Sequence, residues 1–146
     1  MVRETYMKAK ASNVHELHVA AELSSLDKVR GFLEKTMGGL SLSEEERLRI
    51  ALSLHEICVN IIRYAYPGAK GGISLKIWQN RHKVFLEIRD KGIPFDPRKK
   101  ATPDPRKKIK AGEKSGWGIF LSRSLMDEYA YRRAGGENIL TIAKNI

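Results

Sequence analysis

A strongly apolar stretch at residues 51–66 contains no proline or glycine, and it constrains the fold more than any other part of the chain. Ser43 lies upstream of it and is followed by three glutamates, the last of them Glu46, three residues on. A serine with a glutamate three residues later is a capping box, and acidic residues suit the first turn of a helix. Pro67 and Gly68 end the pattern. The sequence therefore predicts one long helix from about Ser43 to Tyr66.

This helix has two distinct sides. At 100° per residue one apolar stripe should face the core, and it comprises Ile50, Leu54, Ile57, Cys58, Ile61 and Ala65. On roughly the opposite side lie Glu56 and Asn60, four residues and about 6 Å apart along the axis. They are flanked by Leu48, Leu52 and Val59, so this side does not resemble a plain solvent face. The pattern indicates a polar site over a helix, with an exposed Glu/Asn pair on an ordinary amphipathic helix as the alternative.

Length and composition place the chain in a broad class. Its 146 residues suit one domain with a proper core. No apolar run approaches the length of a membrane span, and the first ten residues have no apolar segment of the kind found in secretory signals. The single cysteine, Cys58, cannot form an internal disulfide, and no Cys/His spacing suits a structural zinc site. We therefore expect a cytoplasmic protein.

The net charge of +10 is unevenly distributed. Between Pro97 and Lys114 there are eight basic and two acidic residues, which gives +6 in eighteen residues. A basic segment of this kind favours phosphates, acidic proteins or nucleic acid as partners. Taken alone, however, a run of charge favours a solvated loop.

The first half of the chain predicts a leader, a strand and two helices. Residues 1–13 read as a flexible leader, and alternation predicts a strand over Val14–Ala20. Ser24 or Ser25 can cap a helix that ends at Gly38-Gly39. Its apolar positions are Leu26, Val29, Phe32, Leu33 and Met37. The long helix follows.

The second half predicts two hairpins separated by a loop and a helix. Residues 72–79 and 84–90 alternate as paired strands with one buried face. Trp78 falls among the polar positions of the opposite face. No regular pattern survives through residues 97–115, which is typical of a functional lid. A helix over residues 116–127 should turn Ile119, Phe120 and Leu125 inward, and residues 128–133 and 138–143 form the last hairpin around Gly135-Gly136. This order predicts a two-layer α/β sandwich, with helices on one face of a mostly antiparallel mixed sheet, as a single domain over 14–146.

Three polar clusters each suit a part of a nucleotide. Asp90 at a strand end can accept a hydrogen bond from an adenine amino group, and Gly92 allows close approach of the backbone. Gly116 and Gly118 open a helix, where free N–H groups favour phosphates. Asn60 offers an amide oxygen suited to Mg²⁺. Glu56 can take a proton from a group that attacks the γ-phosphate. Taken singly, Asp-x-Gly is commonly a turn and Gly-x-Gly commonly reflects tight packing.

In this order the clusters resemble a known superfamily. Glu56-x-x-x-Asn60, Asp90-x-Gly-x-Pro-Phe-Asp-Pro97 and Gly116-x-Gly-x-x-Leu121 resemble the N, G1 and G2 boxes of the ATPases that include gyrase, heat-shock chaperone, histidine kinase and mismatch-repair proteins. The small bacterial anti-sigma-factor serine kinases are the most similar group. They share the Phe-Asp-Pro extension, Tyr66-Pro-Gly68 and a Leu-Met-Asp like Leu125-Met-Asp127. The resemblance covers about Val14 to the C-terminus and implies a Bergerat-type ATP-binding fold.

The resemblance also implies a role for each matched residue. Asn60 would coordinate Mg²⁺, Asp90 would read the adenine amino group beside Gly92, and Glu56 would be the general base. Backbone N–H groups of Gly116 and Gly118 would hold phosphates under a lid at about 97–115. Further nucleotide contacts are expected from Arg63, Phe95, Trp117 and Thr141, the last of them supporting the adenine contact. Family members often carry His where this chain has Arg63, and no family motif accounts for the basic lid.

The function that follows is an ATP-binding anti-sigma regulator with serine kinase activity. ATP or ADP and Mg²⁺ would be the ligands, and a STAS-type anti-anti-sigma antagonist would be phosphorylated. A sigma factor or comparable regulator would be sequestered. A homodimer is expected, with neither membrane association nor direct nucleic-acid binding. The alternatives are a non-catalytic ATP/ADP-dependent switch, a detached histidine-kinase catalytic domain and nucleic-acid binding through the lid. A histidine-kinase role is disfavoured because no helical dimerisation segment carries a phosphoaccepting histidine.

Overall fold

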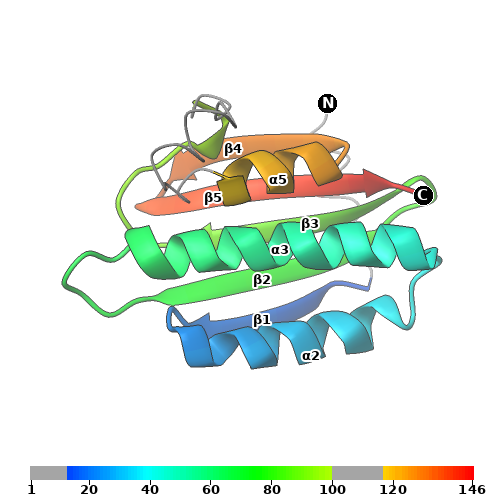
Figure 1. Ribbon diagram of the computed structural model, residues 1–146, viewed down its shortest axis with the longest axis horizontal. Helices are drawn as coiled ribbons and strands as arrows, with labels where there is room; N and C mark the ends of the chain where they lie inside the picture. Colours follow the sequence, from blue (N-terminus) through cyan, green and yellow to red (C-terminus); the bar gives the residue numbers. More distant parts are fainter. Residues whose placement is uncertain (1–12, 100–116) are drawn as a thin grey trace, which may run out of the picture.

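A five-stranded sheet with helices on one face forms the body of the protein (Figure 1). The structure is a computed structural model and describes residues 13–99 and 117–146. The strands are β1 (His15–Ala20), β2 (Gly72–Gln79), β3 (Lys83–Asp90), β4 (Glu128–Ala134) and β5 (Glu137–Asn145). The helices are α2 (Leu26–Met37), α3 (Glu44–Tyr64) and α5 (Trp117–Leu125), with 3₁₀ turns at Leu23–Ser25 and Pro97–Lys99.

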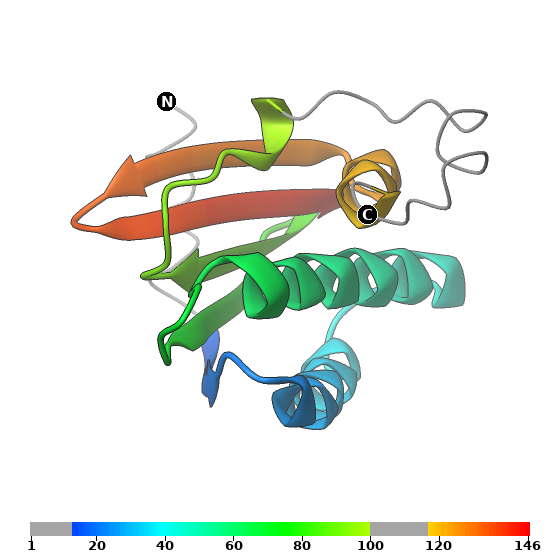
Figure 2. The same cartoon turned by 60° about the vertical axis from the view of Figure 1, so that its left-hand side comes forward.

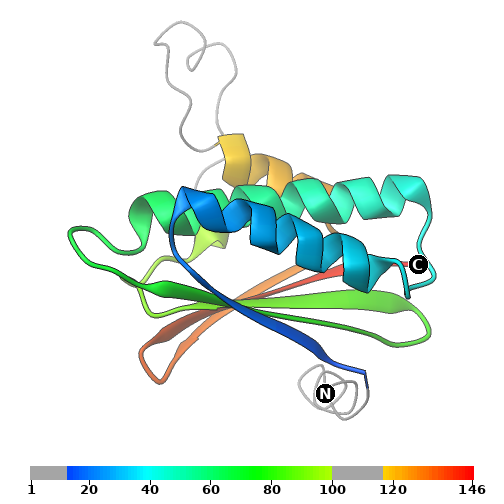
Figure 3. The ribbon, with the colours of Figure 1, turned by 90° about the horizontal axis from the view of Figure 1, so that it is seen from below.

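The strand order is β1-β2-β3-β5-β4, and each of the four pairings is antiparallel. All strand pairs in the described residues are thus antiparallel. The sequence predicted a mostly antiparallel sheet of mixed type. Both hairpins are confirmed, and Gly135 and Gly136 turn the second one at φ of 59° and 76°. These positive φ values favour glycine, which has no Cβ to clash in that conformation. The two-layer sandwich is confirmed, because α2, α3 and α5 all lie on the same side of the sheet (Figures 2 and 3).

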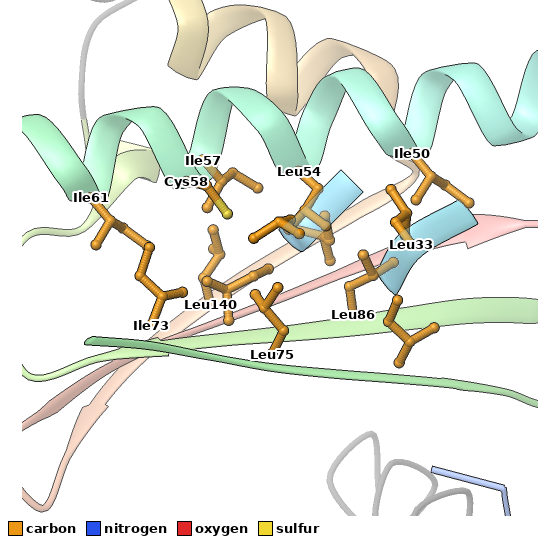
Figure 4. Packing of buried hydrophobic residues seen from close by; sticks show 14 of the residues in the cluster. Leu33, Ile50, Leu54, Ile57, Cys58, Ile61, Ile73, Leu75, Leu86 and Leu140 are labelled. Atoms are coloured by element: carbon orange, nitrogen blue, oxygen red, sulfur yellow. The ribbon is translucent and has the colours of Figure 1, made fainter. Parts of the chain in front are cut away.

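The long helix α3 begins as the capping box predicts. The Ser43 hydroxyl accepts a hydrogen bond from the Glu46 backbone N–H at 3.1 Å, and the Glu46 carboxylate accepts one from the Ser43 N–H at 3.3 Å. The predicted stripe is buried along its whole length, from Ile50 to Ala65. It packs against residues such as Leu75 and Leu86 of the sheet (Figure 4). Each fully buried Leu or Ile contributes roughly 1.5–3 kcal/mol relative to exposure.

Two details of the sequence pattern were wrong. Trp78 lies on the sheet face away from the helices but is 1% exposed, because its ring stacks on Phe85, its partner across the strands, at a centroid distance of 5.3 Å. Aromatic pairs across strands stabilise a sheet, and this pair anchors a second small cluster with Ala143 and Val14. Phe120, expected inward, is 40% exposed, whereas Ile119 beside it is buried.

In the part of the chain that the structure describes, no helix combines the length and the apolar character needed to cross a lipid bilayer.

The reactivity of the Cys58 thiol tests whether the core is packed as described. Burial raises the pKa of this thiol from 9.0 to about 12, and the thiolate is the reactive form of cysteine. We therefore expect iodoacetamide at pH 8 to alkylate the folded protein about a thousandfold more slowly than the protein unfolded in guanidinium chloride. Intact mass gives an unambiguous readout, since the chain has one cysteine. Comparable rates in the two states would show that the α3 stripe is not held against the sheet.

Candidate functional site

A pocket opens where α3, α5 and the ends of three strands meet. Its walls are mainly apolar and include Ile57 and Ile61 of α3, Ile88 of β3, Ile119 of α5 and Leu140 of β5. These elements come from distant parts of the sequence, and the antiparallel pairing of β3 with β5 brings two of them together. A concave apolar pocket with few polar groups is the usual form of a small-molecule site.

Asp90 is the carboxylate of this pocket. It lies at the last position of β3 and is 6% exposed. Its Oδ1 accepts hydrogen bonds from the Gly92 N–H and from Asn138 Nδ2, both at 2.9 Å. Burial raises the pKa of Asp90 above its ordinary value, and the hydrogen bonds from Asn138 and Gly92 oppose that rise. The carboxylate is thus held in a fixed orientation in largely apolar surroundings.

Gly92 has no room for a side chain. A Cβ at this position would lie 2.3 Å from the carbonyl oxygen of Ala65 and 2.5 Å from the Ala65 Cβ. The next residue, Ile93, donates its N–H to the same carbonyl at 2.9 Å. The Arg133 side chain donates a hydrogen bond to the Gly92 carbonyl at 2.8 Å. The turn after β3 is therefore packed directly on the C-terminal end of α3.

Tyr66 also holds the turn after β3 in place, through its hydroxyl group. Its hydroxyl donates to the Gly72 carbonyl at 2.6 Å and accepts from the Lys91 N–H at 2.8 Å. A Cβ on Gly71 would lie 2.0 Å from the Tyr66 ring. The Tyr-Pro-Gly segment thus links the end of α3 to β2 and to the turn after Asp90. From the sequence, this segment was expected only to end the long helix and to match the family.

Glu56 belongs to α3, and its carboxylate reaches the start of α5. A Cβ added to Gly118 would be 2.4 Å from Glu56 Oε2, so the carboxylate contacts the first turn of α5. One turn earlier, the Ser53 hydroxyl donates to the Ser122 carbonyl at 3.0 Å and ties the two helices together. Glycine at 118 therefore makes room for the Glu56 carboxylate beside a helix N-terminus.

The remaining predicted site residues divide into three groups. Asn60 and Phe95 line the same pocket as Asp90. Arg63 is exposed on α3 and is not among the lining residues. Trp117 is the first residue of α5, and Gly116 and most of the expected lid lie outside the described residues.

The expectation for Thr141 is corrected by the sheet register. Thr141 pairs with Glu87, on the face of the sheet away from the helices, whereas Asn138 pairs with Asp90 on the pocket face. Side chains alternate between faces along a strand, so Thr141 cannot reach the pocket that Asn138 and Leu140 line. Asn138 is the residue that contacts Asp90. It comes two residues after Gly136 of the hairpin turn, where a polar residue is easily attributed to the turn itself.

The start of the expected lid is held against β4. Arg98 pairs with Asp96 at 2.9 Å, and its guanidinium lies over the Tyr131 ring at 5.9 Å from the centroid. The ion pair with Arg98 lowers the pKa of Asp96. The Arg123 side chain donates to the Arg98 carbonyl at 3.4 Å. Residues 96–98 therefore lie along the pocket rim, where Pro97 is one of the lining residues.

Metal ligands are sparse in the described chain. Residues 13–99 and 117–146 contain no group of three or more His, Cys, Asp or Glu side chains that could hold a metal ion. Mg²⁺ in nucleotide sites commonly takes one or two protein ligands and completes its shell with phosphates and waters. The Asn60 amide, which lines the pocket and makes no side-chain hydrogen bond within the described part, fits that role.

The solved structures that resemble this fold include the following two. One holds the RsbU and RsbW domains of Rv1364c from Mycobacterium tuberculosis, with a TM-score of 0.63 and 15% identity over 91% of this chain; the match spans 32% of that longer chain. The other is the SiaB-SiaC complex from Pseudomonas aeruginosa, with a TM-score of 0.58 and 14% identity over 99% of this chain and 96% of that one. At these identities the likeness shows the fold alone.

The comparison with curated proteins finds no match. The model of the histidine kinase-like ATPase domain matches residues 19–144, which is nearly the whole chain and includes every element of the pocket. The chain therefore belongs to the histidine kinase-like ATPase domain family.

Proposed function

We propose that the protein is an ATP-dependent serine kinase of the anti-sigma type. It would phosphorylate a serine of a STAS-type antagonist protein and would sequester a sigma factor or a comparable regulator. The observation that carries the proposal is the position of the Glu56 carboxylate, which lies against Gly118 at the first turn of α5 and four residues from Asn60. A general base belongs beside the phosphates, and a helix N-terminus is where phosphates bind.

The pocket supports the choice of ATP as substrate. Its apolar walls suit a purine ring, and Asp90 supplies one buried acceptor for the adenine amino group. The backbone at Gly92 would lie beside the ring, with Phe95 at the rim. The N–H groups at the start of α5, including those of Trp117 and Gly118, would bind phosphate oxygens, and Arg63 would add positive charge nearby. Asn60 would hold Mg²⁺, which would neutralise charge on the phosphates.

Within this arrangement the transfer step is simple. The serine oxygen of the antagonist forms a bond to the γ-phosphorus while the bond to the β–γ bridging oxygen breaks, and ADP leaves. The hydroxyl proton passes to the Glu56 carboxylate. The chain's own contribution is to orient ATP and to place an acceptor for that proton.

The partner assignment draws on the fold neighbours and on the family resemblance. One neighbour was solved as the SiaB-SiaC complex, and the other carries RsbU and RsbW domains in one chain. We propose a cytoplasmic homodimer that pairs along a sheet edge, for which β1 and β4 are the edge strands.

Phosphate transfer is the decisive experiment. The purified protein, ATP and Mg²⁺ should be incubated with a panel of STAS-type proteins from the same organism, and phosphoserine located by mass spectrometry. Modification of one serine in one panel member is the expected result. Tight ATP binding with no transfer to any member would favour a non-catalytic switch, in which ATP and ADP act through different affinities for two conformations.

The metal assignment predicts the behaviour of Asn60→Ala. We expect its affinity for ATP in the presence of Mg²⁺ to fall by about tenfold or more, because the metal loses its protein ligand. With EDTA present, variant and wild type should bind ATP alike. Isothermal titration measures both affinities. Asn80→Ala is the matched control, since Asn80 caps the β2–β3 turn far from the pocket. Equal affinities of Asn60→Ala and wild type with Mg²⁺ would refute the metal assignment.

A further inference from the structure

Asn138 is the most fully bonded side chain at the pocket. It lies near the start of β5, directly opposite Asp90 of β3, and is 6% exposed. Its Nδ2 donates to Asp90 Oδ1 at 2.9 Å and to the Ile93 carbonyl at 2.8 Å. Its Oδ1 accepts from the Phe95 N–H at 3.2 Å and from the Tyr131 hydroxyl at 2.5 Å. Two donor hydrogens and two acceptor positions are all in use.

These partners determine the positions of the oxygen and the nitrogen of the Asn138 side-chain amide. The Asp90 carboxylate and the Ile93 carbonyl offer only acceptors, and the Phe95 N–H is only a donor. A flipped amide would place oxygen against oxygen on one side and nitrogen against N–H on the other. The side chain therefore has one orientation, and it joins Asp90 to the backbone of residues 93–95.

This orientation decides which oxygen of Asp90 is available. Oδ1 already accepts from the Gly92 N–H and from Asn138 Nδ2. Oδ2 has no hydrogen-bond partner within residues 13–99 and 117–146, and Asp90 lines the pocket. A ligand that donates one hydrogen bond to this carboxylate is thus directed to Oδ2.

We propose that Asn138 is the positioning residue for nucleobase selectivity, because it occupies Oδ1 of Asp90 and presents Oδ2 to the exocyclic amino group of adenine. The proposal rests on ATP binding at the pocket, as set out in the proposed function. Asn138 itself would not contact the base. It acts through Asp90, and it also holds the backbone at Phe95, which lies at the pocket rim.

A purely structural role makes a different prediction. If Asn138 only held the turn together, its loss would weaken the binding of every purine triphosphate by the same factor. If it orients Asp90, its loss should affect only a ligand that carries the amino group. The two roles are separated by comparing ATP with purine riboside triphosphate, which lacks the 6-amino group and is otherwise identical.

The experiment measures both affinities for wild type, Asn138→Ala and the isosteric Asn138→Asp. Wild type should prefer ATP by roughly tenfold or more, the usual effect of one hydrogen bond to a charged group. In both variants the preference should fall to near unity, with affinity for purine riboside triphosphate retained. Two variants are used because one of them can fail to fold, which circular dichroism and thermal melting detect.

Asn80→Ala and Asn80→Asp are the matched controls. Asn80 also accepts two hydrogen bonds through its side chain, from the N–H groups of His82 and Lys83, but at the opposite end of the β2–β3 hairpin. Both controls should keep the wild-type preference. The proposal is overturned if a folded Asn138 variant keeps that preference or loses affinity for both nucleotides equally. A wild type that binds both nucleotides alike would instead contradict the assignment of Asp90 and, with it, the proposed function.

Discussion

Glu56→Gln is expected to slow phosphate transfer by about 10²–10⁴-fold, the range for loss of a general base. The amide keeps the size of the side chain, so the contact with Gly118 is preserved. It cannot accept the proton that leaves the serine hydroxyl. Affinity for ATP should stay near the wild-type value, because Glu56 is not among the residues that line the pocket. Single-turnover transfer and isothermal titration measure the two quantities separately.

Glu44→Gln provides the matched control for this prediction. Glu44 lies on the same helix, is exposed in its first turn, and lies about three turns from Glu56. Its variant should transfer phosphate at the wild-type rate. If Glu56→Gln also transferred at the wild-type rate, another group would have to be the base. If it lost ATP binding, Glu56 would belong to the binding site.

Gly92→Ala should weaken both ATP binding and the fold. The added methyl group would meet the Ala65 carbonyl at 2.3 Å, and this contact involves backbone, which cannot rotate away. The turn must therefore move, which breaks the Ile93–Ala65 hydrogen bond and displaces the Gly92 N–H from Asp90. We expect affinity for ATP to fall about tenfold or more. The free energy of unfolding should drop by about 1–3 kcal/mol, as for other overpacked sites.

Gly31→Ala serves as the control for the effect of a methyl group alone. Gly31 lies within α2, and a Cβ there would have no heavy atom within 4 Å. Alanine is favoured over glycine inside a helix, so this variant should gain roughly 0.5–1 kcal/mol of stability. Urea unfolding measures stability in both variants. Wild-type stability and ATP affinity in Gly92→Ala would mean that the turn does not pack on Ala65.

Local patterns in the sequence were sufficient to predict most of the helices, strands and turns. The capping box at Ser43, the stripe from Ile50 to Ala65 and the Gly-Gly turn at 135–136 all depend on neighbours within a few residues. Interactions of this range can be recognised without knowing the fold. The Trp78–Phe85 stack is also a neighbour pair across a predicted hairpin, yet it was missed. Alternation alone placed Trp78 among the polar positions, whereas its stack on Phe85 buries it.

The residues of the site also differ in whether a local motif or a long-range contact identifies them. The sequence by itself determined the long helix with Glu56 and Asn60 on one side, the Asp90–Gly92 turn and the glycine that opens α5, because each is a short motif. Only the tertiary structure decided that Asn138, not Thr141, contacts Asp90. That choice depends on the register between β3 and β5, whose residues are 48 apart in sequence at this contact. Side chains alternate between the two faces of a sheet, so a shift of one residue in register would exchange their roles.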